Sequence, residues 1–277
     1  MLESAGASSD DNPHPGARSI TDITSQQPPL PLPELCAQIH DRVHAFLNAE
    51  PKDDRVRAVQ RQSRISLGVI EEALKRYSPA EISLSYNGGK DCLVLLLLYL
   101  CALHTHHHPH PSTYPSTLNS VYIIPPHPFP AVSSFVTATA STYHLTLTRL
   151  ALPMREAFTA YLSSNPSIRA IFVGTRRTDP HGAELTHFDP TDRGWPEFMR
   201  VHPVIDWRYA EIWTFIRELG VEYCGLYDEG YTSLGGREDT HRNPALKERE
   251  GEGFRPAYEL VEDGEERLGR DWGEGRP

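Results

Sequence analysis

The chain has 277 residues, of which 39% are hydrophobic and 23% charged. This composition excludes fibrous and wholly disordered proteins and allows one α/β domain with tails, or two small domains. The formal net charge is -10, from 27 Lys and Arg against 37 Asp and Glu. Such a balance argues against sequence-independent binding of nucleic acid, which depends on a basic surface.

The cysteines and the apolar runs indicate a cellular compartment. The four cysteines include no C-x-x-C pair, which suits a reducing environment, and we expect Cys92 and Cys101 to be buried thiols in their apolar stretch. The first residues lack the segments of a signal peptide. The longest apolar run, residues 92–103, is shorter than the ~20 residues of a membrane span. We therefore expect a cytoplasmic protein without a membrane partner. We also expect a monomer, and the net charge predicts no nucleic-acid partner.

Residues 1–33 are rich in Ser, Asp and Pro and have no apolar period, which predicts a disordered tail. Two stretches with helical spacing follow, and each predicts an amphipathic helix. The two apolar faces consist of Leu35, Ile39, Val43, Phe46 and Leu47, and of Leu67, Ile70, Leu74 and Tyr77.

A strand at residues 82–85 is predicted to lead through a turn into an apolar helix from Lys90 to about Leu103. The His-rich residues 105–116 are predicted to form a surface insertion. A metal site is the alternative, because His-rich runs can bind metal. Three prolines interrupt this run, however, and no Cys or acidic residue stands beside it.

Strands and helices then alternate along the chain. Residues 34–220 are therefore predicted to form an α/β domain with a doubly wound, mostly parallel sheet. Residues 221–277 are predicted to form a loop-rich extension that covers the substrate-binding site of this domain. Asp206 is a possible N-cap of the last helix. The remaining predicted strands are 121–124, 145–149 and 168–174, and the remaining helices are 132–143, 154–162 and 212–219.

The turn in residues 85–91 (SYNGGKD) has the chemistry of a phosphate site. Backbone N–H groups and the positive end of a helix hold phosphate, and Gly88 and Gly89 let the backbone approach closely. The turn is not a Walker A loop. That pattern requires Gly where Leu84 stands, and Ser or Thr where Asp91 stands.

The SYNGGKD turn resembles the PP-loop of ATP pyrophosphatases, which cut ATP between its α- and β-phosphates. Further motifs follow in order: GTRRTDP at 174–180, T-D…W-P-x-F-M-R…H-P at 191–203 and CGLYDEGYTSLG at 224–235. Over about residues 65–270 this series resembles the monofunctional, fungal-type FAD synthases of the PAPS-reductase-like group. The resemblance implies a PP-loop fold and an FMN adenylyltransferase, which transfers AMP from ATP to the phosphate of FMN and releases pyrophosphate.

The resemblance also implies roles for individual residues, with ATP and FMN as substrates and Mg²⁺ as cofactor. The ATP-binding residues would be Ser85, Asn87, Gly88, Gly89, Lys90 and Asp91, with Asp91 also reaching the Mg²⁺. The flavin side would be formed by Arg176, Asp179, Asp192, Trp195 and Arg200. Arg267 and Arg270, in the sequence ERLGR, match a C-terminal pattern whose arginines meet the phosphates. With Asn87 and Asp91 they complete the predicted catalytic set. Residues 125–129 depart from the family, which carries acidic residues there.

Structural and functional alternatives stay open. Asp179 before a proline is also an ordinary turn residue, Trp195 also suits a core, and Arg267 and Arg270 also suit a solvated tail. The functional alternatives are a sulfonucleotide (PAPS) reductase-like enzyme, which would need a nucleophilic cysteine near the C-terminus, and a non-catalytic nucleotide-binding module. No cysteine follows Cys224.

The phosphate of FMN is already charged at neutral pH, so the transfer reaction needs no general base.

Overall fold

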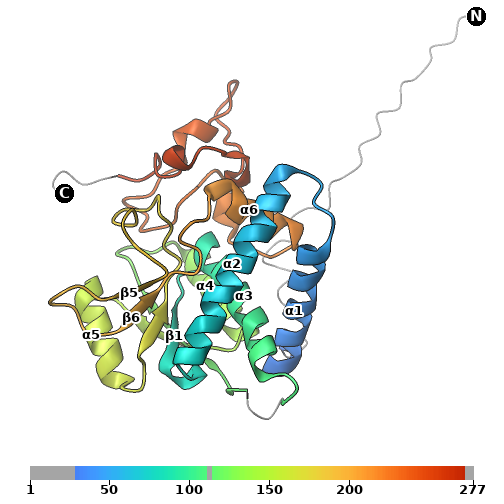
Figure 1. The fold of residues 1–277 in the computed structure, drawn as a ribbon. Helices are drawn as coiled ribbons and strands as arrows, with labels where there is room; N and C mark the ends of the chain where they lie inside the picture. The colour runs from blue at the N-terminus through green and yellow to red at the C-terminus, as the bar shows by residue number, and fades with distance from the viewer. Residues whose placement is uncertain (1–28, 111–113, 272–277) are drawn as a thin grey trace, which may run out of the picture.

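The computed structural model describes residues 29–110 and 114–271 as an α/β fold around one sheet (Figure 1). The strands lie in the order β3-β2-β1-β4-β6-β5, and all neighbours are parallel except the antiparallel pair β5–β6. The predicted mostly parallel, doubly wound sheet is thereby confirmed. The strands are β1 (Ile82–Ser85), β2 (Leu118–Ile123), β3 (Leu145–Leu150), β4 (Ala170–Phe172), β5 (Phe188–Pro190) and β6 (Met199–Val201).

Helices cover both faces of the sheet, because right-handed crossovers that step in opposite directions place their helices on opposite faces. The connections β1–β2 and β2–β3 step one way, and the connection β3–β4 steps back past β1. The sheet therefore has a hydrophobic core on each face. In the smaller core, α5 packs on Val121 and Ile171, while Leu84 and Phe172 belong to the larger core on the other face. The helices are α1 (Leu32–Asn48), α2 (Asp54–Arg76), α3 (Lys90–His107), α4 (Pro130–Thr142), α5 (Met154–Ser164) and α6 (Tyr209–Glu218).

The reversal of direction places two motif loops side by side. It occurs between β1 and β4, which are hydrogen-bonded neighbours. In open α/β sheets, ligands bind beyond the carboxyl ends of the strands at such a switch point. The turn at residues 86–89 follows β1, and the loop at residues 173–180 follows β4. Both loops that the sequence predicts as substrate-binding therefore leave the sheet at this point.

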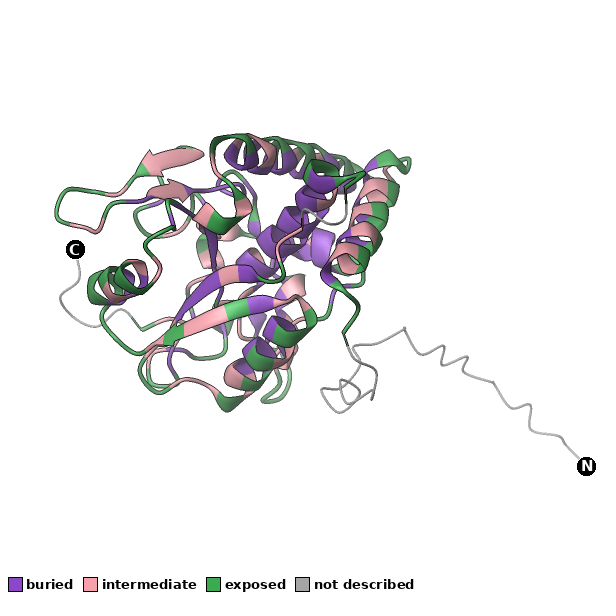
Figure 2. Cartoon of the chain, turned by 90° about the horizontal axis from the view of Figure 1, so that it is seen from below, coloured by how far each residue is buried: buried purple, intermediate pink, exposed green. Residues whose placement is uncertain are grey.

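Helix α3 lies in the centre of the larger core. Every residue from Cys92 to Leu103 is buried, which explains why this helix is apolar on all sides rather than on one face. Figure 2 shows buried residues (purple) in the central strands β1, β2 and β4 and on the inner faces of the helices, whereas the outer strands are mostly pink and green. Cys92 and Cys101 are buried, as predicted. In the described part of the chain, none of the helices has the length and hydrophobicity that a membrane span requires.

Three predicted boundaries were wrong. α1 begins at Leu32, which is 3% exposed, so the predicted tail is too long by two residues; residues 1–28 lie outside the described part. α3 continues to His107, so the start of the His-rich insertion is helical; residues 111–113 are outside the description. Strand β4 is shorter than the predicted 168–174 because only Ala170–Phe172 pairs with both of its neighbours.

The prediction of Asp206 as an N-cap was also wrong. α6 begins after Arg208, whose N–H donates to Glu211 at 2.8 Å. The carboxylate of Asp206 instead lies 2.7 Å from Nε of Arg177. Strands β5 and β6 were not predicted at all, because three residues are too few to show a period.

The C-terminal extension consists of short 3₁₀ turns and loops above the sheet (Figure 1, orange to red). Polar side chains hold it together from inside. The buried amide of Asn243 donates to the hydroxyl of Thr232 at 2.8 Å and to the carbonyl of Glu265 at 2.7 Å. The extension also packs against the segment after β2, where the N–H of Arg237 donates to the carbonyl of His127 at 2.8 Å.

Candidate active site

The turn after β1 has a backbone geometry that only glycine fits. Gly88 has φ +75°, and a Cβ at this position would lie 2.7 Å from Cγ2 of Val136. The N–H of Gly89 donates to the side-chain oxygen of Asn87 at 2.9 Å, just before α3 begins. The hydroxyl of Tyr227, in the extension, accepts from the N–H of Lys90 at 3.0 Å. The turn is therefore held both by its own Asn and by the extension. Ser85, another predicted ATP ligand, is the last residue of β1.

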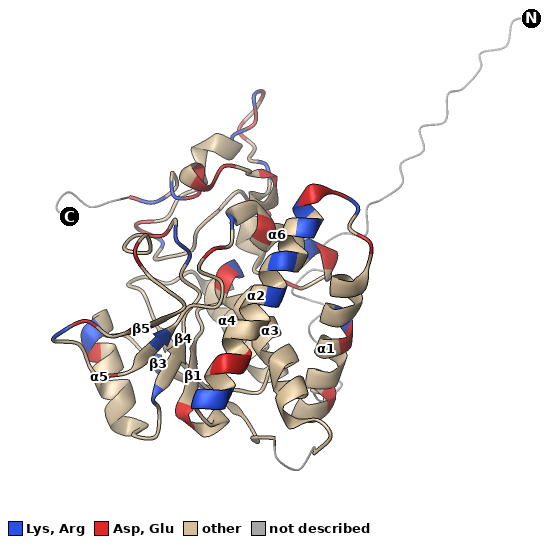
Figure 3. Cartoon of the chain, in the orientation of Figure 1, with Lys and Arg blue, Asp and Glu red and all other residues tan. Residues whose placement is uncertain are grey.

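A cluster of charged side chains joins this turn to the loop after β4 and to the extension. We call Lys90, Asp91, Arg176 and Glu266 the ion network. Nζ of Lys90 lies 3.0 Å from Oδ2 of Asp91 and also contacts Oε1 of Glu266. Arg176 places Nε 2.7 Å from Oδ1 of Asp91, and its NH2 contacts Oε2 of Glu266. Asp263 adds a further contact to Arg176 at 3.3 Å. Figure 3 shows basic and acidic segments interleaved in the loops above the sheet.

The network is largely withdrawn from solvent. The side chains of Arg176, Lys90 and Glu266 are 0%, 2% and 5% exposed, and only Asp91, at 20%, is partly open. The ammonium of Lys90, a predicted ATP ligand, therefore faces carboxylates, and its contact with ATP stays a prediction.

Electrostatics favour the charged forms of Lys90 and Asp91 in this network. Burial alone would lower the pKa of Lys90, but Asp91 and Glu266 outweigh it and raise the pKa. For Asp91, burial acts to raise the pKa, and the nearby Lys90 and Arg176 more than reverse this, so the pKa is below its usual value. Buried charges persist only when they are paired in this way.

Asp179 has a double role in the loop after β4. One carboxylate oxygen accepts from the N–H of Arg176 at 2.8 Å, which closes the turn, and the other lies 3.3 Å from NH1 of Arg267. Asp179 is thus a turn residue, and it is also the partner of a predicted phosphate-binding arginine. The pairing brings Arg267, from the far end of the chain, to the switch point.

Arg270 lies on a glycine of the CGLYDEGYTSLG motif. A Cβ on Gly235 would lie 2.5 Å from NH2 of Arg270, so only glycine leaves room for the guanidinium. The guanidinium also lies 3.2 Å from the carbonyl oxygen of Asp239 and 3.4 Å from Oγ of Ser233. Arg270 is 18% exposed in its side chain, so it is not a freely solvated charge.

The remaining predicted flavin residues form a second group near the antiparallel pair β5–β6. Arg200, in the middle of β6, lies 3.3 Å from Oδ2 of Asp192 and donates to the carbonyl of Pro190 at 2.9 Å. The N–H of Trp195 donates to the carbonyl of Asp192 at 3.0 Å. Trp195 also packs on the smaller core beside α5. Asp192 and Trp195 precede β6, so they lie at its amino end, whereas the phosphate turn lies at the carboxyl ends of the parallel strands.

The sequence interpretation missed two residues that complete the site. Glu266 was assigned no role, although it stands inside the ERLGR pattern that singled out Arg267 and Arg270. Tyr209 was also missed: its ring centroid lies 5.0 Å from Nζ of Lys90 and 5.9 Å from Cζ of Arg176. An acidic residue directly before two motif arginines was the available signal for Glu266; Tyr209 offered none.

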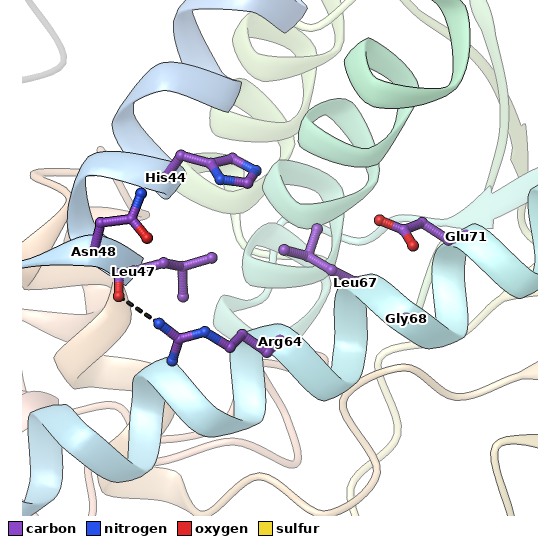
Figure 4. Close-up of a pocket in the computed structure, with 7 residues that line it drawn as sticks. All are labelled: His44, Leu47, Asn48, Arg64, Leu67, Gly68 and Glu71. Carbon is purple, nitrogen blue, oxygen red and sulfur yellow. Dashed lines mark hydrogen bonds between the residues drawn. The ribbon is translucent and has the colours of Figure 1, made fainter.

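Two further observations concern the rest of the described part of the chain. A hollow of about 270 Å³ lies between α1 and α2, but its lining contains none of the predicted site residues (Figure 4). Over residues 29–110 and 114–271, no three His, Cys, Asp or Glu side chains are grouped so that they could hold a metal ion. The described histidines of the His-rich run therefore give the metal alternative no support.

The cysteines do not suit the reductase alternative. All four are buried and free. Burial raises the pKa of Cys224, the last cysteine of the chain, so its reactive thiolate form is disfavoured.

Known proteins resemble this chain in sequence and in fold. Residues 151–242 match the family model of the phosphoadenosine phosphosulfate reductase domain. A Schizosaccharomyces pombe protein named "Probable FAD synthase" is 43% identical over 226 residues, which cover 82% of this chain and 84% of the relative.

Solved structures extend the match to three dimensions. Candida glabrata FMN adenylyltransferase in complex with FMN and the ATP analogue AMPCPP has a TM-score of 0.84 at 30% identity, covering 89% of this chain and 99% of that one. The same enzyme in complex with FAD and inorganic pyrophosphate gives a TM-score of 0.84, again at 30% identity. The resemblance in the sequence motifs is thereby confirmed, and the chain belongs to the FAD synthase family.

Proposed function

We propose that this protein is an FMN adenylyltransferase, which makes FAD and pyrophosphate from FMN and ATP. The observation that carries the proposal is the meeting of three segments at the switch point: the phosphate turn after β1, the loop after β4, and the arginine-bearing end of the extension. Arg176 and Asp91 join the first two at 2.7 Å, and Arg267 reaches Asp179 at 3.3 Å. Cations and backbone donors gathered at one point suit a reaction between two anions.

The chemistry requires alignment more than proton transfer. An oxygen of the FMN phosphate attacks the α-phosphorus of ATP and forms the new P–O bond. The bond from this phosphorus to the oxygen that bridges it to the β-phosphorus breaks, and pyrophosphate leaves with the electron pair. The attacking phosphate has a second pKa near ~6, so it is already charged at neutral pH. Catalysis then depends on holding the two groups in line and neutralising charge, which arginines and turn amides do.

A single FMN is long enough to use both predicted flavin groups. The loop after β4 and the group around Asp192 lie at opposite ends of β6, a strand of three residues. Two steps of about 3.3 Å separate the ends of such a strand. We propose that the phosphate of FMN lies near Asp179 and Arg267, and that its ribityl chain reaches along the sheet to place the ring near Trp195 and Arg200.

Mg²⁺ is the proposed cofactor, and Asp91 is the residue that fits it. Magnesium takes one or two carboxylates together with substrate phosphates and waters, so a multi-residue cage is not required. Each carboxylate oxygen has two lone pairs, and Asp91 is 20% exposed beside the phosphate turn. When bound, the ion would neutralise charge on the ATP phosphates. The residues of the chain orient those phosphates through the turn amides and the arginines.

The test is to incubate the purified protein with FMN and MgATP and to separate the flavins by chromatography. We expect FAD and one equivalent of pyrophosphate, and no FMN from riboflavin, because no Walker A loop is present. Absence of FAD would refute the proposal. A cytoplasmic location, a monomeric state and the absence of nucleic-acid or membrane partners stay predictions.

A further inference from the structure

Glu266 lies where the three segments of the site meet. Its side chain is 5% exposed, and its two carboxylate oxygens contact different cations: Oε1 binds Lys90 at the start of α3, and Oε2 binds Arg176 in the loop after β4. One side chain from the extension therefore bridges both substrate-binding loops. Lys90 and Arg176 are 86 positions apart in the sequence, so this bridge exists only in the folded protein.

The charges make this bridge necessary. Without Glu266, the buried cations Lys90 and Arg176 would share mainly the carboxylate of Asp91, with Asp263 touching Arg176 at 3.3 Å. A buried cation without a full set of partners is unfavourable, and the segments that carry such cations move apart or admit water.

The backbone of Glu266 is held as firmly as its side chain. Its carbonyl accepts from the hydroxyl of Thr232, and the amide of Asn243 lies 3.3 Å from the same oxygen. The next residue is Arg267, which lies 3.3 Å from Asp179. Glu266 therefore fixes the point from which the Arg267 side chain starts, relative to both loops.

We infer that Glu266 is a positioning residue for Arg267 in the adenylyl transfer. This inference rests on the proposed function and deepens it: the Glu266 side chain takes no part in the bond changes, but it sets where the arginine meets the phosphates. The ERLGR segment then works as a unit in which the Glu anchors and the Arg binds.

The experiment compares Glu266→Gln with Glu262→Gln in the full chain, by measuring kcat and KM for FAD formation. Glu262 is exposed and four residues away, so it is the matched control. Gln keeps the shape of Glu266 but loses the charge, and its amide nitrogen repels one of the two cations. We expect kcat/KM to fall about tenfold or more for Glu266→Gln and to stay within about twofold for the control.

A double-mutant cycle separates positioning from general stability. In an Arg267→Ala background, Glu266→Gln should lower kcat/KM by less than about threefold, because the group that it positions is absent. An equal fall in both backgrounds would overturn the inference, as would wild-type kinetics for Glu266→Gln. If the Gln variant does not fold, the same cycle is run with Glu266→Asp, which keeps the charge but shortens the reach. Wild-type protein that makes no FAD would instead refute the proposed function.

Discussion

Oδ1 of Asp91 lies 2.7 Å from Nε of Arg176, so the helix after the phosphate turn and the loop after β4 are joined by an ion pair. The other oxygen of Asp91 lies 3.0 Å from Nζ of Lys90. A residue predicted to bind a metal ion is thus also a structural link between two loops. Its substitution tests both roles.

Asp91→Asn should reduce turnover by two orders of magnitude or more and should also lower Tm. The loss of turnover follows from the proposed place of Asp91 beside the ATP phosphates. The loss of stability follows because Arg176 and Lys90 keep their buried charges but lose a carboxylate partner, which typically costs about 3–5 kcal/mol for a fully buried pair and less for a partly open one. Steady-state kinetics over a range of Mg²⁺ concentrations and thermal unfolding measure the two effects. Asp54→Asn, exposed at the start of α2, is the control. Normal turnover with normal Mg²⁺ dependence would show that Asp91 is only structural.

Arg267→Ala and Arg270→Ala should each lower kcat/KM by roughly ten- to a hundredfold. A hydrogen bond to a charged phosphate contributes about 1.5–3 kcal/mol. Losing that much transition-state stabilisation lowers kcat/KM by roughly ten- to a hundredfold. Arg→Lys should recover only part of the loss, because Lys lacks the two-pronged contact. Arg249→Ala, exposed and outside the motif, should leave kcat/KM unchanged. If both motif variants match this control, the ERLGR segment has no part in the reaction.

Gly235→Ala gives an independent test of Arg270. The added methyl group would lie 2.5 Å from NH2 of Arg270, which is the end of a flexible side chain and can move aside. The fold should therefore survive while the guanidinium is displaced. We expect kcat/KM close to that of Arg270→Ala and a circular dichroism spectrum like that of the wild type. Full activity in Gly235→Ala would mean that the position of the Arg270 guanidinium is unimportant.

The stability of the protein should fall between pH 6.5 and 4 because of His202. This side chain is 2% exposed, and burial lowers its pKa to about 4. In the unfolded chain the pKa is about 6.5, so between these values the unfolded state binds more protons and unfolding becomes easier as the pH falls. The full difference corresponds to about 3 kcal/mol. Urea unfolding at several pH values should give a steeper loss for the wild type than for His202→Asn. The exposed His181→Asn should follow the wild type, and parallel curves for His202→Asn would contradict the assignment.

Two truncations should locate where the folded domain begins. Removing residues 1–28 should leave activity and Tm unchanged, because this Ser- and Pro-rich stretch has no apolar face to pack. Removing residues 1–33 also deletes Leu32, which is 3% exposed in the first turn of α1. Burial of such a side chain contributes about 1.5–3 kcal/mol, so Tm should fall by roughly 3–12 °C. Equal Tm values for the two truncated proteins would show that the first turn of α1 contributes nothing.

Much of the fold was predictable because its signals are local. The spacing of apolar residues in α1 to α6 and in the longer strands lies within single elements. The two adjacent glycines before α3 likewise predict the turn that they form. Strands β5 and β6 were missed because their three residues form a strand only through pairing with each other and with β4. Asp206 was misread for a similar reason, since its partner Arg177 lies in a distant loop.

The sequence by itself determined the family, the phosphate turn and the arginines of the ERLGR segment. Each of these motifs consists of residues that are neighbours in the chain, so it can be recognised without the fold. Only the tertiary structure decided how these parts act together. Lys90 begins α3, Arg176 lies in the loop after β4 and Glu266 belongs to the extension, and nothing in their spacing predicts that they pair. Their contact depends on the strand order that places β1 beside β4 and on the fold of the extension above them. Burial then makes the pairing obligatory, because buried charges must find partners.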